Sequence, residues 1–124
     1  MGSAARVVKV SAHRSWIDLV KLDHALFRLN LYIGAVRNPQ EYQCKTHNEC
    51  RLGMWYNQQL ANFRDNAAFR SIEAPHAAFH AAAAEFIGAI RAHDEIVAGR
   101  ALDDLERAGG EVIAALDEFA RAVS

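Results

Sequence analysis

Four side chains of the kinds that bind transition metals fall at spacings at which three helical segments can bring them to one ion: His24, Cys50, His76 and His80. The last two form a His-x-x-x-His pair. Residues four apart lie one above the other on the same helix face, so both imidazoles can reach one ion. Imidazole nitrogen and thiolate sulfur are zinc ligands, and zinc takes four of them in a tetrahedron. The sequence therefore predicts a zinc site with three histidines and one cysteine.

The first ligand lies on a helix that the sequence predicts to end before Pro39. Apolar residues recur there at the period of one helix face, and His24 falls in the same series. The series consists of Trp16, Val20, His24, Phe27, Leu31 and Gly34. The stretch 40–49 that follows is polar and predicted to be irregular. A second, shorter helix is expected to begin at Cys50 and to fade near Asp65.

The third predicted helix begins near Pro75, because a proline in the first turn of a helix leaves no hydrogen bond unmade. His76, His80, Ala83, Ile87 and Ile90 then share one face, so both imidazoles point inward. Gly99 is expected to mark the next break. A fourth helix follows, on a stripe of Leu102, Leu105, Gly109, Val112, Leu116, Phe119 and Val123. The glycines at 109 and 110 favour close approach of a neighbouring helix.

Four amphipathic helices with short links predict an all-α fold, an antiparallel four-helix bundle with or without an extra short helix. The zinc site would lie in the bundle core. At 124 residues the chain is expected to form one domain, residues 4–124. Residues 1–3, with the sequence Met-Gly-Ser, look like an expression scar. Residues 4–14 do not keep the apolar register of the first helix and receive no assignment.

The composition excludes several classes of partner. The chain carries 14 Lys and Arg against 15 Asp and Glu, a net charge of -1, and has no basic run suited to nucleic acid. No segment approaches the ~20 apolar residues of a membrane span, and no signal peptide is visible. We therefore expect a soluble, cytoplasmic domain without direct membrane contact. A reducing compartment would keep both cysteines, Cys44 and Cys50, as thiols.

Other residues near the site allow alternatives. A single histidine on an apolar face is more often a hydrogen-bonded core residue than a ligand. His47 lies three residues before Cys50 and could replace one of the named ligands. Asp23 is a candidate for the carboxylate that orients a ligating histidine, although a solvated role is the commoner one. Cys44 could act as a resolving thiol for an oxidised Cys50 or be a bystander.

Three segments together resemble the bacterial chemoreceptor zinc-binding (CZB) domain. They are Leu-Asp-His at 22–24, Glu-Cys-Arg-Leu-Gly-Met-Trp-Tyr at 49–56, and Pro-His-Ala-Ala-Phe-His at 75–80. The order of the three is far more specific than any one of them. The resemblance implies a zinc ion held by His24, Cys50, His76 and His80. It also implies a helical bundle that is often a homodimer, joined to a chemoreceptor signalling domain or a diguanylate cyclase, or found alone.

A site closed by four protein ligands leaves no position for a substrate, so we do not expect an enzyme. Similar domains respond to hypochlorous acid or to zinc itself. We expect Cys50 to act as a redox switch for hypochlorous acid that regulates chemotaxis, because one oxidation removes the only sulfur ligand. The loop 40–49 would then be the part that moves.

Two alternatives use the same four ligands. One is zinc sensing through occupancy of the site, controlling a diguanylate cyclase, and the other is a purely structural zinc-stapled dimerisation module. A di-iron bundle is disfavoured because such sites need inward carboxylates at Glu-x-x-His spacing. Arg28 and Ala84 occupy the positions four residues after His24 and His80.

Overall fold

A computed structural model describes the backbone of residues 2–123 and the side chains of residues 15–123. The expected expression scar lies outside the described side chains. The helices are α1 (Gly2–Arg37), α2 (Arg51–Phe63), α3 (Ala67–Arg70), α4 (Glu73–Arg91) and α5 (Glu95–Ala122). No strand occurs between residues 2 and 123. The predicted all-α class is therefore confirmed.

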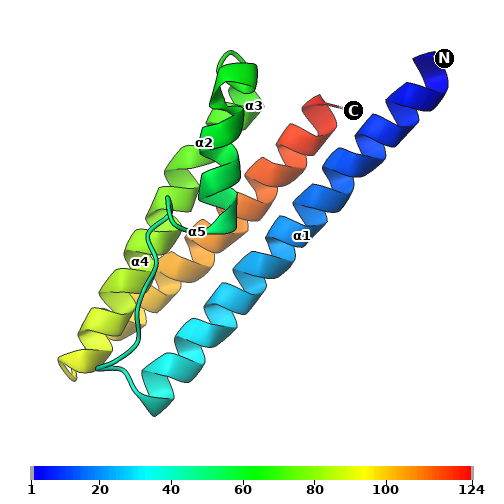
Figure 1. The fold of residues 1–124 in the computed structure, drawn as a ribbon. Coiled ribbons are helices and arrows are strands. Elements are labelled where there is room, and N and C mark those ends of the chain that lie inside the picture. Colours follow the sequence, from blue (N-terminus) through cyan, green and yellow to red (C-terminus); the bar gives the residue numbers. More distant parts are fainter. Residues whose placement is uncertain (1, 124) are drawn as a thin grey trace.

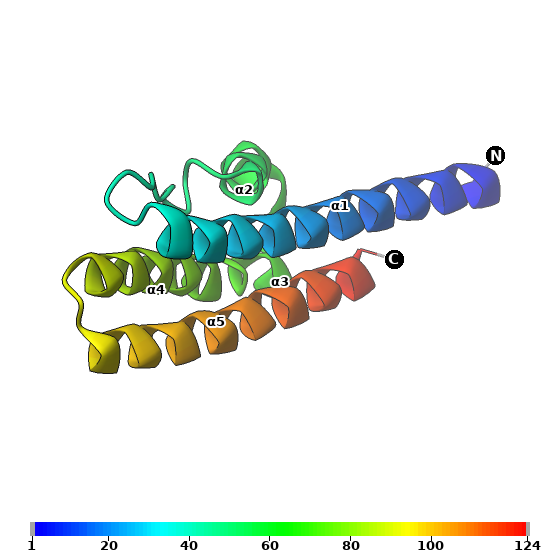
Figure 2. The same cartoon turned by 90° about the horizontal axis from the view of Figure 1, so that it is seen from below.

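The three long helices α1, α4 and α5 run along one another, with α2 beside α1 (Figures 1 and 2). Helices α4 and α5 form the most extensive pair, and α1 packs on both of them. The short helix α3 packs on α5 and supplies the extra element allowed for in the prediction. Within residues 2–123, none of the helices is both long and apolar enough to cross a membrane.

The irregular stretch between α1 and α2 is held against the far end of α4. Arg91 donates one guanidinium hydrogen bond to the carbonyl of Pro39 at 2.5 Å and another to the carbonyl of Tyr42. The ring of Tyr42 covers Gly34, where an added Cβ would lie 2.3 Å from it. Glycine at this position therefore lets the loop fold back closely on α1.

The predicted break at Gly99 is wrong, because Gly99 lies inside α5. Helix α4 instead ends at Arg91, and α5 begins at Glu95. His93 adopts a left-handed backbone with φ 57°, and the Asp94 carboxylate accepts a hydrogen bond from the backbone N–H of Val97 at 3.1 Å. An aspartate N-cap contributes about 1 kcal/mol, comparable to the cost of one glycine within a helix. The cap at Asp94 thus sets the boundary, and α5 tolerates Gly99.

The core combines an aliphatic interior with an aromatic cluster at the end of the bundle where α2, α3 and α5 meet. Phe69 of α3 is fully buried, and Tyr56 stacks on it with ring centroids 4.3 Å apart. Trp55, Phe63 and Phe119 also contact Phe69. The cluster fixes α2, and the predicted cysteine ligand is the residue immediately before this helix. On α5 the predicted stripe is buried at Leu105, Val112, Leu116 and Phe119.

Candidate metal centre

The structure brings the four predicted ligands together in the bundle interior. His24 comes from α1, Cys50 from the residue before α2, and His76 and His80 from the first two turns of α4. One candidate ligand atom of each residue lies within 4.8 Å of the others. The exposed fractions are 8% for His24, 1% for His76 and 4% for His80, so these imidazoles are shielded from water.

The histidine nitrogens that face the centre lack ordinary partners. His80 donates its Nδ1–H to the carbonyl of Lys45 at 2.8 Å, which leaves its Nε2 with a free lone pair. The Nε2 atoms of His24 and His80 are buried and have no hydrogen-bond partner among the described residues. A buried polar atom without a partner costs about 1–3 kcal/mol. A cation bound between these nitrogens would remove that cost, so the residues present fit a metal ion.

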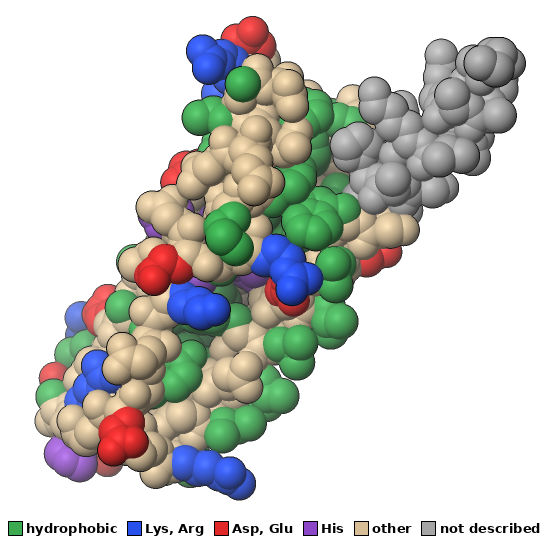
Figure 3. All heavy atoms as spheres, in the orientation of Figure 1, with side chains coloured by type: hydrophobic (Ala, Val, Ile, Leu, Met, Phe, Trp, Pro, Cys, Tyr) green, Lys and Arg blue, Asp and Glu red, His purple; other side chains and the backbone are tan. Residues whose placement is uncertain are grey.

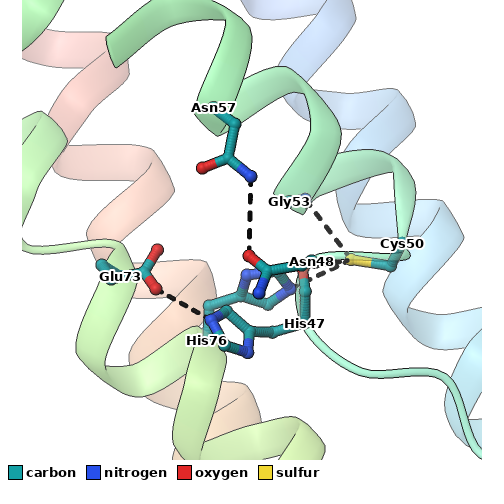
Figure 4. A network of polar contacts seen from close by, with 7 residues as sticks. All are labelled: His47, Asn48, Cys50, Gly53, Asn57, Glu73 and His76. Atoms are coloured by element: carbon teal, nitrogen blue, oxygen red, sulfur yellow. Dashed lines mark hydrogen bonds and ion pairs between the residues drawn. The ribbon is translucent and has the colours of Figure 1, made fainter.

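Cys50 closes the group from the side of the loop. Its sulfur lies 3.1 Å from His76 Nε2 and accepts a hydrogen bond from the Gly53 backbone N–H at 3.4 Å (Figure 4). Cys50 thereby acts as the N-cap of α2, where the helix dipole favours negative charge. Burial nevertheless raises the pKa of the Cys50 thiol, and the nearby Asp23 carboxylate raises it further. A bound cation would supply the charge that keeps this sulfur a thiolate.

Burial also fixes the protonation state of the histidines. It lowers the pKa of His24 to about 4 and that of His76 to about 2, and the neighbouring imidazoles act in the same direction. Burial lowers the pKa of His80 as well, although the hydrogen bond to Lys45 opposes this shift. All three imidazoles are therefore neutral at pH 7, the form that binds metals.

The loop that carries Cys50 is anchored to α4 next to the centre. His47 Nε2 lies 2.9 Å from the Glu73 carboxylate, and the Asn57 amide donates to the Asn48 side chain at 3.5 Å (Figure 4). The loop backbone crosses directly over Gly53, where an added Cβ would lie 1.7 Å from the His47 carbonyl oxygen. The Cys-x-Leu-Gly sequence thus needs its glycine so that the loop can reach the centre.

Aromatic rings form the apolar wall of the centre. Phe79 stacks on His24 with ring centroids 5.0 Å apart, and Phe27 packs on His80 at 4.7 Å. Phe79 in turn faces Gly109 of α5, where an added Cβ would lie 3.3 Å from its ring. The close helix approach expected at this glycine therefore occurs, and it backs His24 through Phe79.

The remaining candidates lie outside the group of four. His47 is engaged by Glu73, and its ring centroid is 5.7 Å from that of His76. Asp23 pairs with Arg51, with 3.1 Å between Oδ2 and Nε. Its negative charge also raises the pKa of the Cys50 thiol, although burial of the thiol is the larger cause. Cys44 is a free, partly buried thiol.

The group that orients His80, one of the predicted ligands, is the backbone carbonyl of Lys45. Sequence reasoning missed it because a carbonyl carries no residue-type signal, and only the path of the loop reveals it.

The chain matches a known protein family. The family model described as "Chemoreceptor zinc-binding domain" matches residues 19–87, which is more than half of the chain and includes all four clustered residues. No curated protein and no solved structure matches the chain significantly.

The depressed histidine pKa values predict that acid destabilises the zinc-free protein. Below the unfolded-state pKa of about 6.5, the histidines of the unfolded chain bind protons, whereas those of the folded chain do not. This difference lasts until the pH falls to the folded-state pKa, which is about 4 for His24. The free energy of unfolding should therefore fall between pH 6.5 and 4, by about 1 kcal/mol per pH unit for each affected histidine. Urea denaturation at a series of pH values measures this slope. His76→Leu should flatten it, and equal stability at pH 7 and pH 5 in the parent would contradict the assignment.

The crossing of the loop over Gly53 predicts that Gly53→Ala displaces the loop and with it Cys50. Zinc affinity should fall by roughly 10–100-fold, as expected when support around a ligand is lost, in a competition titration with a chelator. Gly88→Ala is the matched control, since it lies on α4 with nothing within 4 Å of the added Cβ. It should keep the parent's affinity. Equal affinities for the two variants would show that the loop crossing does not position the ligand.

Proposed function

We propose that this chain, which belongs to the chemoreceptor zinc-binding domain family, is a signal-transduction domain whose cysteine is a zinc-linked redox switch. The observation that carries the proposal is the convergence of two unpartnered, buried imidazole nitrogens, His76 and a cysteine sulfur in one shielded group. Neutral imidazoles and one thiolate suit zinc, which accepts nitrogen and sulfur in a tetrahedral set. His24, Cys50, His76 and His80 would hold the ion.

The donor set supports a binding role over catalysis. Catalytic zinc sites keep one coordination position open for water or substrate, whereas four protein donors fill a tetrahedron. We infer that the domain acts by changing the state of an attached partner. We propose a chemoreceptor signalling domain that regulates chemotaxis as that partner, in the cytoplasm, where reduced thiols such as Cys44 and Cys50 persist.

Cys50 is suited to react with hypochlorous acid. Zinc, when bound, keeps this sulfur in its nucleophilic thiolate form. The thiolate attacks the oxidant, the sulfur takes up the hydroxyl group to give a sulfenic acid, and chlorine leaves as chloride with the electron pair. Sulfur is oxidised and chlorine is reduced, and no further reactant is needed.

Cys50 lines a pocket at the surface of the molecule. A pocket of about 460 Å³ has Cys50 in its wall, together with Asp23, Phe27, Lys45 and Arg51. Cys50 itself is only partly buried, unlike the three histidines. A small, uncharged oxidant such as hypochlorous acid fits this route, and the three histidines are each at most 8% exposed.

Oxidation of Cys50 would change the contacts of the loop, because Cys50 is both the proposed metal ligand and the N-cap of α2. A sulfenic acid lacks the negative charge of the thiolate. That charge binds the cation and strengthens the hydrogen bond that the sulfur accepts from the Gly53 N–H. The same loop holds His80 through Lys45 and α4 through His47. Release of the sulfur therefore loosens several contacts at once. The end of the loop next to α1 is held by the hydrogen bonds from Arg91. The change is therefore confined to the segment next to α2.

Zinc sensing through occupancy, controlling a diguanylate cyclase, is the second candidate. The same loop contacts favour this candidate. The position of the loop depends on the positions of the four ligands, and these change both when the sulfur leaves the ion and when the ion itself is lost. Here Cys50 would serve only as a ligand, and a purely structural staple would produce no signal in either case.

The redox proposal predicts that about one equivalent of hypochlorous acid releases or loosens the zinc of the purified protein. A colorimetric zinc indicator measures the release. Cys44→Ser, which keeps all four ligands, should respond like the parent. Cys50→Ser should bind zinc more weakly from the start and show no further oxidant response. A Cys50→Ser protein that answered the oxidant as the parent does would refute the switch, and zinc retained by the oxidised parent would favour occupancy sensing or a staple.

A further inference from the structure

The second ring nitrogen of His24 has no partner in the protein. A ligating histidine gives one nitrogen to the ion, and its other N–H usually donates to a carboxylate or a carbonyl. His80 follows this pattern through its hydrogen bond to the Lys45 carbonyl. No hydrogen bond joins either nitrogen of His24 to another described residue. Because its Nε2 faces the centre, the proton of the neutral ring lies on Nδ1, and this N–H is unpaired although the side chain is only 8% exposed.

His24 lies in the wall of a pocket between α1 and α5, which we call the α1–α5 pocket. Its volume is about 290 Å³, and the two helices run side by side along it (Figure 2). On the side of α5 the wall contains Gly109 and Gly110. A Cβ added at Gly110 would meet nothing within 4 Å, so the space beside this glycine is open. A partner for the unpaired His24 N–H can therefore bind in this pocket.

The basic residues of the wall lie on either side of His24. Lys21 is three residues before it and Arg28 four residues after it, so the three side chains share one face of α1. The face of the molecule in Figure 3 shows mainly hydrophobic side chains along α1, whereas Lys21 and Arg28 turn toward α5. With His24, the wall thus contains three side chains that donate hydrogen bonds, and two of them are positively charged.

The acidic groups near the pocket are already engaged. Glu106 accepts a hydrogen bond from Arg28 at 2.9 Å on one oxygen and a hydrogen bond from the Tyr32 hydroxyl on the other. Asp117 pairs with Lys21 at 2.5 Å. An ammonium group has three N–H donors and a guanidinium group has five, so Lys21 and Arg28 keep donors that these pairs do not use. The missing group in the pocket is therefore an acceptor, and the two cations favour one with negative charge.

We propose that the α1–α5 pocket binds a small oxyanion, a carboxylate or a phosphate group, which accepts hydrogen bonds from His24, Lys21 and Arg28. An oxyanion suits these donors because its oxygens can accept from several directions at once, as the positions of the three donors on two turns of α1 require.

The site makes the oxyanion an effector of the metal centre. An acceptor on the second N–H of a ligating histidine fixes the orientation of the ring and raises the basicity of the ligand nitrogen. The bound anion thus increases the affinity for zinc, and by thermodynamic linkage zinc increases the affinity for the anion by the same factor. This effect rests on the proposed zinc-binding role and is independent of oxidation at Cys50.

Nuclear magnetic resonance of the zinc-loaded protein with ¹⁵N-labelled histidine tests the site directly. Sodium acetate and inorganic phosphate are titrated separately, with sodium chloride keeping the ionic strength constant. We expect a saturable shift of His24 Nδ1, and no shift of His80 Nδ1, which the Lys45 carbonyl already occupies. A response to acetate alone identifies a carboxylate site, and a response to phosphate alone identifies a phosphate site. A pocket that holds only water gives no saturable shift, and that result, or equal shifts of both histidines, would overturn the proposal.

Two variants of the wall have matched controls in the same titration. Arg28→Gln should weaken anion binding roughly tenfold, the effect of losing one hydrogen bond to a charged group. Arg121→Gln, which removes an arginine paired with Glu118 outside the pocket, should bind as the parent does.

Gly110→Leu adds an apolar side chain to the wall and should also weaken anion binding. Gly99→Leu is its control, because Gly99 lies on the same helix, outside the pocket, with nothing within 4 Å of an added Cβ. Parent-like anion binding in both Arg28→Gln and Gly110→Leu would overturn the assignment of the site.

Competition with a chelator then measures the coupling to the metal. The zinc dissociation constant of the parent should be roughly five- to tenfold lower with saturating anion than in chloride at equal ionic strength, the lower end of typical coupling between sites. The Arg28→Gln protein should lose this difference at the same anion concentration. A parent that binds no zinc would contradict the proposed function, whereas zinc affinity that is the same with and without anion would overturn only the effector role.

Discussion

The structure depends on one constraint: neutral imidazole nitrogens and a thiol that converge in the apolar interior of a helical bundle need a cation between them. His24 and His80 each bury an Nε2 atom without a partner, and His76 meets Cys50 at 3.1 Å. Burial keeps the imidazoles uncharged and disfavours a thiolate. A zinc ion would satisfy the nitrogens and stabilise the thiolate at once, and it would join α1, α4 and the start of α2 in a single cross-link.

The loop between α1 and α2 connects this centre to the rest of the molecule. It supplies Cys50, orients His80 through the Lys45 carbonyl, and is held to α4 by His47 and by Arg91. Gly53 lets the loop lie directly on α2. Because one short segment performs all these tasks, a chemical change at its single sulfur is transmitted to several contacts.

Sequence reasoning located the four clustered residues because helix periodicity and ligand spacing are local properties. Inward positions on regular helices, such as His24, His76 and His80, follow directly from the 3.6-residue repeat. The boundary at Asp94 was missed because a left-handed residue such as His93 depends on its surroundings, and Gly99 appeared to be the stronger signal. The hydrogen bond between His80 and the Lys45 carbonyl could not be predicted from the sequence, because it depends on tertiary structure.

X-ray absorption at the zinc edge, with the metal content of the same sample, tests the central claim most directly. The account predicts one zinc per chain, with one sulfur at about 2.3 Å and three nitrogens at about 2.0–2.1 Å. A spectrum without sulfur, or with oxygen in place of a histidine nitrogen, would contradict the three-histidine, one-cysteine centre. So would a protein that retains no zinc after purification in its presence.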